Sequence, residues 1–348
     1  MSVLYLLEPQ SIIHKEGGRL VVKKGGDTLH SVHIFRLDQV VIMGPVILTP
    51  AVIRTLLQEG VDTVFMSRRG YYYGRLQGPE SKNIVLRRDQ FGRFTDPGFV
   101  LSTAKAVVKG KLRNQRALLQ RLMRNQKGID LKKAVDGIGR LADLADSAAD
   151  LDELRGYEGQ AAATYFPAWG KGLKVDGLSF SRRIRRPPKD PVNALLSLGY
   201  TLLLNNVLAA AHSTGLDPYL GALHAVDYGR PSLALDLMEE WRPLIIDTLV
   251  LSVFNLGVLT GKDFTTNPPQ EENGLRGEEI DGRGPGTYLT DAGWRKYIGQ
   301  FERRMAAEVT FHLNEQHLSY RDCIRQQVRH FANYLQGDFD VYQPMPLR

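Results

Sequence analysis

The sequence has 348 residues, of which 43% are hydrophobic and 24% are charged. This composition excludes a disordered or fibrous protein and suffices for one or two domains with a buried core. The formal net charge of +7 favours a polyanionic partner, most often nucleic acid. The single cysteine, Cys323, excludes an intrachain disulfide and a multi-cysteine metal site, and it agrees with a cytoplasmic protein.

The first part of the chain has the pattern of short strands. Residues 11–34 alternate apolar and polar side chains around two Gly-Gly pairs, which predicts β-hairpins. A short helix is expected at residues 49–60, with Pro50 at its first helical position. Further strands are predicted at residues 37–44, 61–67 and 71–78. We therefore predict a small β-rich N-terminal domain at residues 1–90.

The pattern changes at "DQFGRFTDPG", whose glycines and proline are typical of an irregular segment. Residues 91–98 are accordingly predicted to be a linker. From Phe99 onward the apolar residues recur with a helical period, which predicts a larger, all-helical domain at residues 99–348. The predicted fold class is α+β with two domains.

No membrane segment is expected. The opening "MSVLYLLEPQ" lacks the basic start and long apolar core of a signal peptide. The longest apolar run, residues 193–211, is interrupted by Gly199, Asn205 and Asn206. It therefore reads as a buried helix and not as a membrane span.

One segment, "GALHAVDYGRPSLALDLMEEWRP", combines a histidine with three carboxylates among apolar residues. Asp236, Glu239 and Glu240 have i, i+3, i+4 spacing, which predicts that they share one face of a helix. Like charges on a partly buried face need a positive partner, because an unpaired buried carboxylate is costly. That partner is either a neighbouring arginine or a divalent metal ion.

His224 favours the metal, because a turn separates it from Glu239 and allows both side chains to converge. One histidine with two carboxylates leaves coordination positions open for water and phosphate, and suits Mg²⁺ or Mn²⁺ better than structural zinc. The candidate for the second carboxylate is Glu158, which has small neighbours that leave room for a ligand. On local sequence alone, a solvated helix glutamate is the favoured alternative.

Four motifs occur in order along the chain: "RGYEGQAAATYFPAW", "RRPPKDPVNALLSLGYTLL", "GLDPYLGALH" and "RPSLALDLMEEWRP". Together they resemble the CRISPR adaptation integrase family, metal-dependent DNA endonucleases that insert new spacers into a CRISPR array. The resemblance covers nearly the whole chain. It implies a small N-terminal β domain, an all-helical catalytic domain, a homodimer and a second small CRISPR adaptation protein as partner.

The resemblance also implies the site residues. The family's metal-binding glutamate falls on Glu158, its histidine on His224 and its third acidic ligand on Glu239, with Asp236 as the rival. These catalytic residues would bind Mg²⁺ or Mn²⁺. The ion is expected to promote attack on a DNA phosphate by water, or by the 3′-hydroxyl of an incoming DNA fragment.

The DNA backbone is expected to lie on the basic run "SRRIRRPPKDP". The alternative is a solvated charge run, or a loop that pairs with acidic helices. Beside a phosphodiester site we prefer phosphate binding, which positions DNA without reading its sequence. The predicted DNA-binding residues are Arg182, Arg183, Arg185, Arg186 and Lys189.

Two other functions stay open. A structure-selective nuclease acting on branched DNA in repair could use the same site, and substrate preference would separate it from an integrase. A non-catalytic DNA-binding scaffold would use the acidic residues structurally. The combination of Glu158, His224 and Glu239 argues against the scaffold, which has no need to keep these residues together.

Overall fold

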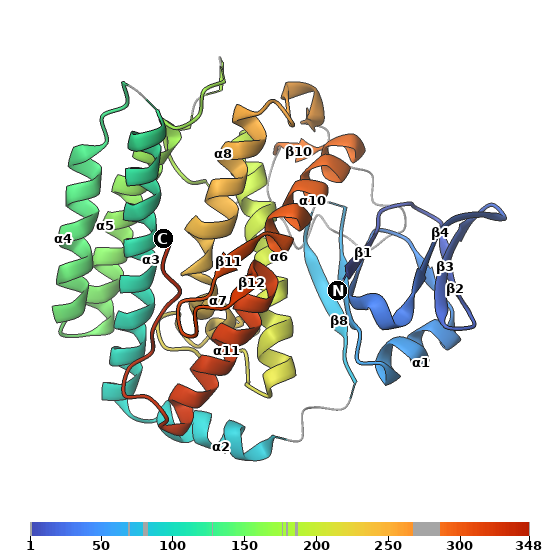
Figure 1. Ribbon diagram of the computed structural model, residues 1–348, viewed down its shortest axis with the longest axis horizontal. Coiled ribbons are helices and arrows are strands. Elements are labelled where there is room, and N and C mark those ends of the chain that lie inside the picture. Colours follow the sequence, from blue (N-terminus) through green and yellow to red (C-terminus); the bar gives the residue numbers. More distant parts are fainter. Residues whose placement is uncertain are drawn as a thin grey trace. The chain divides into compact units, whose positions relative to one another are not determined.

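The computed structural model describes residues 2–68, 70–78, 83–126, 128–175, 177–178, 180–184, 187–266 and 286–347. The chain divides into two compact units (Figure 1). The β-rich unit comprises Met1–Glu80 with Thr265–Tyr288, and the helical unit comprises Ser81–Phe264 with Leu289–Arg348. This division into a strand-rich front and a helical remainder confirms the predicted α+β fold class.

The β-rich unit contains two four-stranded sheets. In the sheet of order β1-β5-β7-β8, the first three strands are parallel and β8 is antiparallel to β7. In the sheet of order β4-β3-β2-β6, two antiparallel hairpins turn at the predicted Gly-Gly pairs. The bounds are β1 (Ser2–Leu6), β2 (Ile12–Glu16), β3 (Arg19–Lys24), β4 (Asp27–His33), β5 (Leu37–Met43), β6 (Ile47–Leu48), β7 (Asp62–Met66) and β8 (Tyr72–Leu76), with the short helix η1 (Ile34–Arg36) and helix α1 (Pro50–Gln58).

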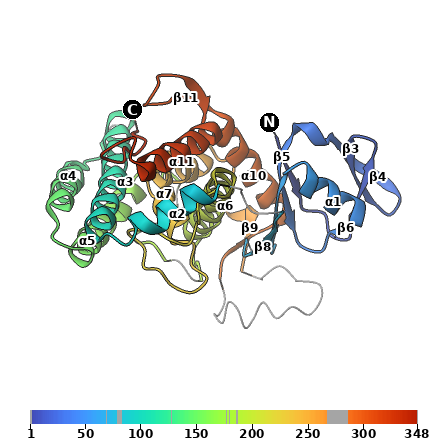
Figure 2. The ribbon, with the colours of Figure 1, turned by 90° about the horizontal axis from the view of Figure 1, so that it is seen from below.

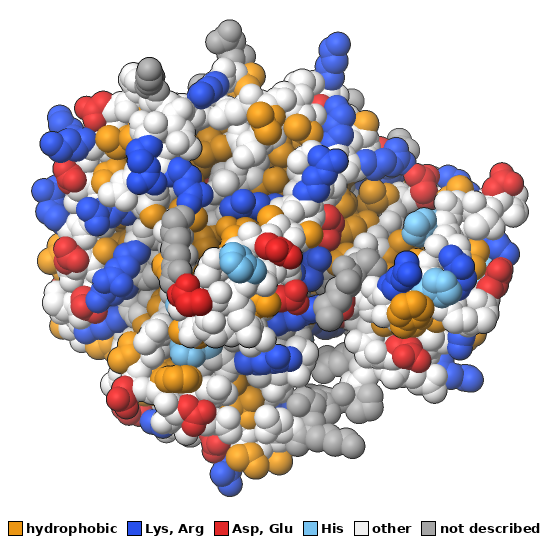
Figure 3. Space-filling view, in the orientation of Figure 1, with side chains coloured by type: hydrophobic (Ala, Val, Ile, Leu, Met, Phe, Trp, Pro, Cys, Tyr) orange, Lys and Arg blue, Asp and Glu red, His pale blue; other side chains and the backbone are white. Residues whose placement is uncertain are grey.

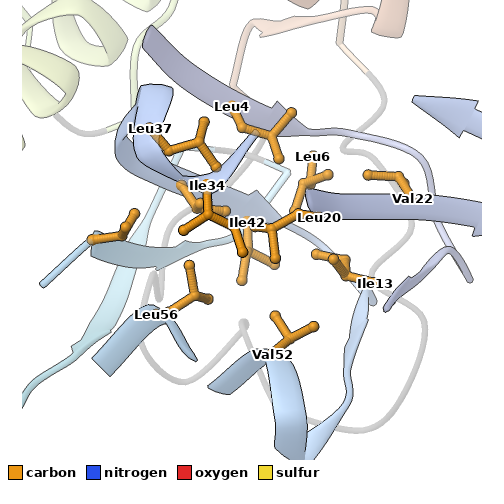
Figure 4. Packing of buried hydrophobic residues seen from close by; sticks show 12 residues of the cluster. Leu4, Leu6, Ile13, Leu20, Val22, Ile34, Leu37, Ile42, Val52 and Leu56 are labelled. Carbon is orange, nitrogen blue, oxygen red and sulfur yellow. The ribbon is translucent and has the colours of Figure 1, made fainter. Parts of the chain in front are cut away.

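The core of this unit is formed by one face of each of its strands and by α1 (Figure 4). Ile13 and Leu20 come from the second sheet and Ile42 from the first, and all three are at most 2% exposed. Val52 and Leu56 of α1 close the cluster. Alternate side chains of a strand point to opposite faces, so the period-two pattern of the sequence places these residues together.

The helical unit is built around long helices. Helices α3, α4 and α5 lie side by side at one end of it, and α6 packs against α11 (Figures 1 and 2). The helices are α2 (Ile84–Arg93), α3 (Pro97–Asn125), α4 (Lys132–Ser147), α5 (Leu151–Gly170), α6 (Pro191–Thr214), α7 (Ser232–Met238), η2 (Arg242–Asp247), α8 (Thr248–Asn255), η3 (Gly261–Asp263), α10 (Asp291–Ala306) and α11 (Tyr320–Gln336). The short strands outside the two four-stranded sheets are β9 (Phe264–Thr265), β10 (Tyr288–Leu289), β11 (Glu308–Thr310) and β12 (His317–Ser319).

Helix α6 is the predicted apolar core helix. Pro191 occupies its first turn, the Asp190 side chain accepts a hydrogen bond from the backbone of Asn193, and Gly215 ends it with a left-handed φ of 96°. Within the described residues it is the one helix long and apolar enough to cross a membrane, but 67% of its apolar window is buried inside the protein. A core helix of a globular unit has these properties.

The boundary between the units differs from the predicted one. Residues 84–93 form α2, which packs against α11 within the helical unit. Gln90 fastens it further, because its side chain donates to the carbonyl oxygens of Asp217 and Leu220. Residues 91–98 hold the end of α2, a short turn and the start of α3, so they do not join the two units. Only Leu86 and Gln90 of α2 are buried, so its apolar period is too weak to recognise in the sequence.

Candidate metal centre

A break in the helix separates the three carboxylates that the sequence placed on one face. Helix α7 ends at Met238, residues 239–240 form a turn, and the chain continues as the π-helical segment η2. Asp236, Glu239 and Glu240 are each 2% exposed. Asp236 and Glu239 both lie next to the His224 ring, whereas Glu240 has other partners. The predicted shared face therefore holds for Asp236 and Glu239, which both face the His224 ring, and is wrong for Glu240.

Asp236 organises the loop that carries His224. Its Oδ2 accepts hydrogen bonds from the backbone N–H groups of Ala222 and Leu223, and its Oδ1 accepts one from that of His224. The same Oδ1 lies 2.6 Å from Nδ1 of the His224 ring. An Nδ1–H directed at this carboxylate leaves Nε2 with a free lone pair, which is the form that binds a metal.

Two further residues fix this loop. Gly221 has to be glycine, because a Cβ there would lie 2.5 Å from the backbone carbon of Ser232 and 2.7 Å from Asp236 Oδ2. Arg155 of α5 donates from Nε and Nη2 to the carbonyl oxygen of Leu223. Arg155 lies one helical turn before Glu158, so α5 positions both the loop and a candidate ligand.

Glu239 lies at the helix break and faces three cationic or ligating groups. Its Oε1 is 3.2 Å from Nη2 of Arg242 and 3.8 Å from Nε2 of His224. Its Oε2 is 2.7 Å from Nζ of Lys111. Burial opposes ionisation, but the charges of Arg242 and Lys111 outweigh it and lower the pKa of Glu239 to about 2.

Lys111 of α3 joins Glu239 to Glu158. Its Nζ is 2.5 Å from Glu158 Oε1, and its side chain is 9% exposed. Burial alone would lower the pKa of this ammonium, but the charges of Glu239 and Glu158 raise it above the ordinary value. The structure thus places the predicted Glu158 and Glu239 on either side of an ammonium group, and the predicted His224 next to Glu239.

The donor set fits a hard divalent cation, which prefers carboxylate oxygens and accepts an imidazole nitrogen. Glu239 Oε2 is buried, and the Lys111 ammonium 2.7 Å away neutralises it. Across the residues that the structure describes, no three His, Cys, Asp or Glu side chains surround a single metal-sized point in this conformation. The ammonium of Lys111 lies between the two glutamates instead.

A group of buried polar side chains lies next to the site. Tyr165 and Tyr200 both donate to the carboxylate of Asp247, at 2.6 Å each. The guanidinium of Arg242 lies 4.6 Å from the ring centre of Tyr200, which holds it next to Glu239. Burial raises the pKa of Asp247 to about 6.

Glu240 points away from the site and anchors the C-terminal segment. Its carboxylate accepts hydrogen bonds from the Tyr342 hydroxyl, at 2.6 Å, and from the backbone N–H of Met345. Asn114 of α3 donates to the carbonyl oxygens of Glu240 and Met345. Burial raises the pKa of Glu240 to about 8.

Comparison with known proteins identifies the family. The family model described as CRISPR associated protein Cas1 matches residues 4–303. The chain belongs to the Cas1 family. A relative described as a CRISPR-associated endonuclease Cas1 of Thermus thermophilus is 36% identical over 100% of this chain and 98% of its own. Membership confirms the predicted family and the predicted function, a CRISPR-associated DNA endonuclease and integrase.

Solved structures agree with this Cas1 fold. A casposase bound to its integration product has a TM-score of 0.83 and 25% identity, covering 99% of this chain and 93% of its own. The Cas1-containing chain of a Cas6-RT-Cas1–Cas2 complex has a TM-score of 0.79 and 25% identity, covering 99% of this chain and 36% of its own.

The basic run of this Cas1 chain is not uniform. Arg183 donates to Asn193 Oδ1 and Ser197 Oγ of α6, and its guanidinium lies 5.6 Å from the Tyr200 ring centre. Arg182 and Lys189 are exposed, whereas Arg185 and Arg186 lie outside the described residues. Many other Lys and Arg side chains lie over α3, α4 and α5 (Figure 3). Arg183 is thus half-buried and bonded to α6, and Arg182 and Lys189 face solvent.

Sequence reasoning did not find Lys111 as part of the site. It appeared as one of several basic residues beside the apolar stripe of α3. Its spacing was a usable signal. Val107 and Val108 precede Lys111 by four and three residues, so the three side chains lie on the same face of the helix, and both valines are buried. A lysine on the buried face of a helix needs carboxylate partners, and these are the two candidate ligands.

Proposed function

We propose that this Cas1 protein is a metal-dependent DNA integrase that holds Mg²⁺ or Mn²⁺ with Glu158, His224 and Glu239. The observation that carries the proposal is that the Lys111 ammonium joins Glu158 to Glu239, whose Oε1 lies 3.8 Å from Nε2 of His224. The side chains of Glu158 and His224 are 27% and 18% exposed, so DNA can approach the site from their side.

Asp236 is the less suitable third ligand. Both its oxygens already accept hydrogen bonds from the loop backbone, and Oδ1 also faces the His224 ring. Glu239 instead pairs through Oε2 with the Lys111 ammonium and faces Nε2 of His224 with Oε1. We therefore assign Glu239 as the ligand and Asp236 as the residue that orients His224.

A divalent ion bound there would act as a Lewis acid on the scissile phosphate and would orient the attacking oxygen. Asp236 keeps the His224 ring in one orientation and one tautomer. Arg242 compensates the charge of Glu239. Arg182 and Lys189, which are exposed beside α6, hold the phosphate backbone, and Arg185 and Arg186 of the same run extend this contact.

Two solved relatives support the proposed reaction. A casposase with the same fold was solved with an integration product, and another relative was solved as part of a complex with Cas2. We infer that the 3′-hydroxyl oxygen of a DNA fragment attacks a repeat phosphodiester and displaces the 3′-oxygen of the repeat strand, which leaves as a 3′-hydroxyl. At the same site water can attack instead, which hydrolyses the phosphodiester. We also infer that this chain acts in the cytoplasm as a homodimer, together with a second small CRISPR adaptation protein.

The test is a strand-transfer assay with a short duplex and a supercoiled target, run with Mg²⁺, with Mn²⁺ and with a chelator. We expect joined products only with metal and only when the duplex carries free 3′-hydroxyls. A 3′-deoxy duplex is the matched substrate control. Cleavage of branched DNA without any joining would support the structure-selective nuclease instead.

A further inference from the structure

Lys111 is a buried ammonium placed in the middle of the proposed metal site. It projects from the central turns of α3 and is in contact with one oxygen of Glu158 and one of Glu239, at 2.5 and 2.7 Å. A buried charge is tolerated only with such partners. Lys111 stabilises the two carboxylates in turn, because without a cation they would repel each other.

The same space cannot hold this ammonium and a divalent ion together. Mg²⁺ binds oxygen ligands at about 2.1 Å, so an ion bridging the two oxygens that Lys111 contacts would occupy the position of Nζ. An ion bound to the other carboxylate oxygens would put its double charge beside the ammonium in a water-poor site, where charges of like sign repel strongly. Either arrangement requires Lys111 to withdraw.

The surroundings of Lys111 allow it to withdraw. Its four-carbon stem is flexible, so the head group can move while α3 stays in place. Glu158, its partner on one side, has a side chain that is 27% exposed, whereas that of Glu239 is 3% exposed. The exit therefore lies on the Glu158 side, where the site opens to solvent.

We propose that Lys111 is the resident counter-ion of the metal site, and that its ammonium exchanges with the divalent ion and leaves Glu158 and Glu239 when the metal binds. This inference rests on the proposed function. It makes metal binding a competition between two cations. The residue thus stabilises the metal-free protein and weakens its affinity for the metal.

The first test measures affinity with Mn²⁺ alone, by following free Mn²⁺ with electron paramagnetic resonance in a titration of the full-length protein. Lys111→Met, which keeps the stem and removes the charge, should bind Mn²⁺ about ten-fold more tightly or better. Lys109→Met is the matched control, since Lys109 lies on the same helix but pairs with Asp146 at 2.5 Å. Its affinity should equal that of the wild type.

The second test needs no variant of Lys111, which keeps the proposal testable if Lys111→Met does not fold. Acetylation of wild-type lysines by an N-hydroxysuccinimide ester, read by peptide mass spectrometry, should leave Lys111 unmodified without metal and modify it with saturating Mn²⁺. Lys109 should react equally in both conditions. In the His224→Ala variant, Mn²⁺ should not increase the modification of Lys111.

The outcomes separate this inference from the metal assignment. If Mn²⁺ binding depends on Glu158, His224 and Glu239 but Lys111 stays protected, or if Lys111→Met binds no more tightly, the exchange is refuted and the metal site stands. If the wild type has no saturable Mn²⁺ binding that these three residues support, the proposed site fails, and the exchange fails with it.

Discussion

Nδ1 of His224 lies 2.6 Å from Oδ1 of Asp236, and this contact sets the orientation of the ring toward Glu239. The carboxylate also accepts hydrogen bonds from three backbone N–H groups of the same loop. Asp236 therefore has two tasks, one in folding the loop and one in presenting Nε2. Substitution of Asp236 by asparagine and by alanine should distinguish its role in folding the loop from its role in orienting the His224 ring.

Asp236→Asn should weaken metal affinity by about ten- to a hundred-fold, because one of the two acceptor oxygens becomes an NH2 donor and the His224 ring is supported less well. Asp236→Ala should also lower the free energy of unfolding by about 1–3 kcal/mol for each backbone N–H left without an acceptor. Isothermal titration with Mn²⁺ and chemical denaturation measure the two effects. If Asp236→Asn abolishes metal binding while Glu239→Gln retains it, then Asp236 is the third ligand.

Removal of a proposed ligand should have different effects on stability at the three positions. His224→Ala and Glu158→Gln should abolish metal-dependent joining in a folded protein, since both side chains are partly exposed. Glu239→Ala should in addition destabilise the protein, because it removes the ion-pair partner of the buried Lys111 and Arg242. Thermal denaturation followed by circular dichroism, together with the joining assay, tests whether Glu239→Ala is the least stable of the three variants. Equal melting temperatures for the three variants would contradict this expectation.

The basic run should divide into binding and structural residues. Replacing Arg182 and Lys189 by glutamine should weaken DNA binding and reduce the slope of log affinity against log salt by about 1 for each phosphate that the variant no longer binds. Arg183→Gln should instead lower the free energy of unfolding, because the side chains of Asn193 and Ser197 would have no guanidinium donor. Fluorescence anisotropy at several salt concentrations is the measurement. A reduced salt slope in a fully stable Arg183→Gln protein would place Arg183 on the DNA.

Glu240 should make stability depend on pH. Burial raises its pKa to about 8 in the folded protein, from an ordinary value of 4.5. Between pH 4.5 and about 8 the folded state then binds more protons than the unfolded state. The stability that Glu240 contributes is therefore complete below pH 4.5 and is lost as the pH rises toward 8. In Glu240→Gln this decline should be smaller. Denaturation midpoints of both proteins between about pH 5 and 8 give the comparison, and parallel pH profiles would argue against it.

Much of the fold follows from local sequence. The Gly-Gly pairs mark the hairpins of β2, β3 and β4, and Pro50 and Pro191 mark the starts of α1 and α6, because these signals act within a few residues. Helix α2 escaped recognition because its position depends on contacts such as that of Gln90 with Asp217, which is distant in the chain. Local periodicity carries no information about such contacts.

The candidate site was predictable only in part. The charge pattern indicated His224 and Glu239, whereas Glu158 required the family resemblance. The helix break between Asp236 and Glu240 was not predictable, because Glu240 is held by Tyr342, a contact between distant segments. Lys111 was missed for a similar reason, since its partners lie on α5 and beyond α7.

The most direct test of the metal site is Mn²⁺-dependent strand transfer by the wild type and by Glu158→Gln, with Lys109→Met as a control prepared in parallel. We expect joined DNA from the wild type and from Lys109→Met, and none from Glu158→Gln although that protein is folded and binds DNA. Joining by Glu158→Gln at the wild-type rate, with saturating Mn²⁺, would contradict the assignment of Glu158, His224 and Glu239 as the residues that hold the catalytic metal.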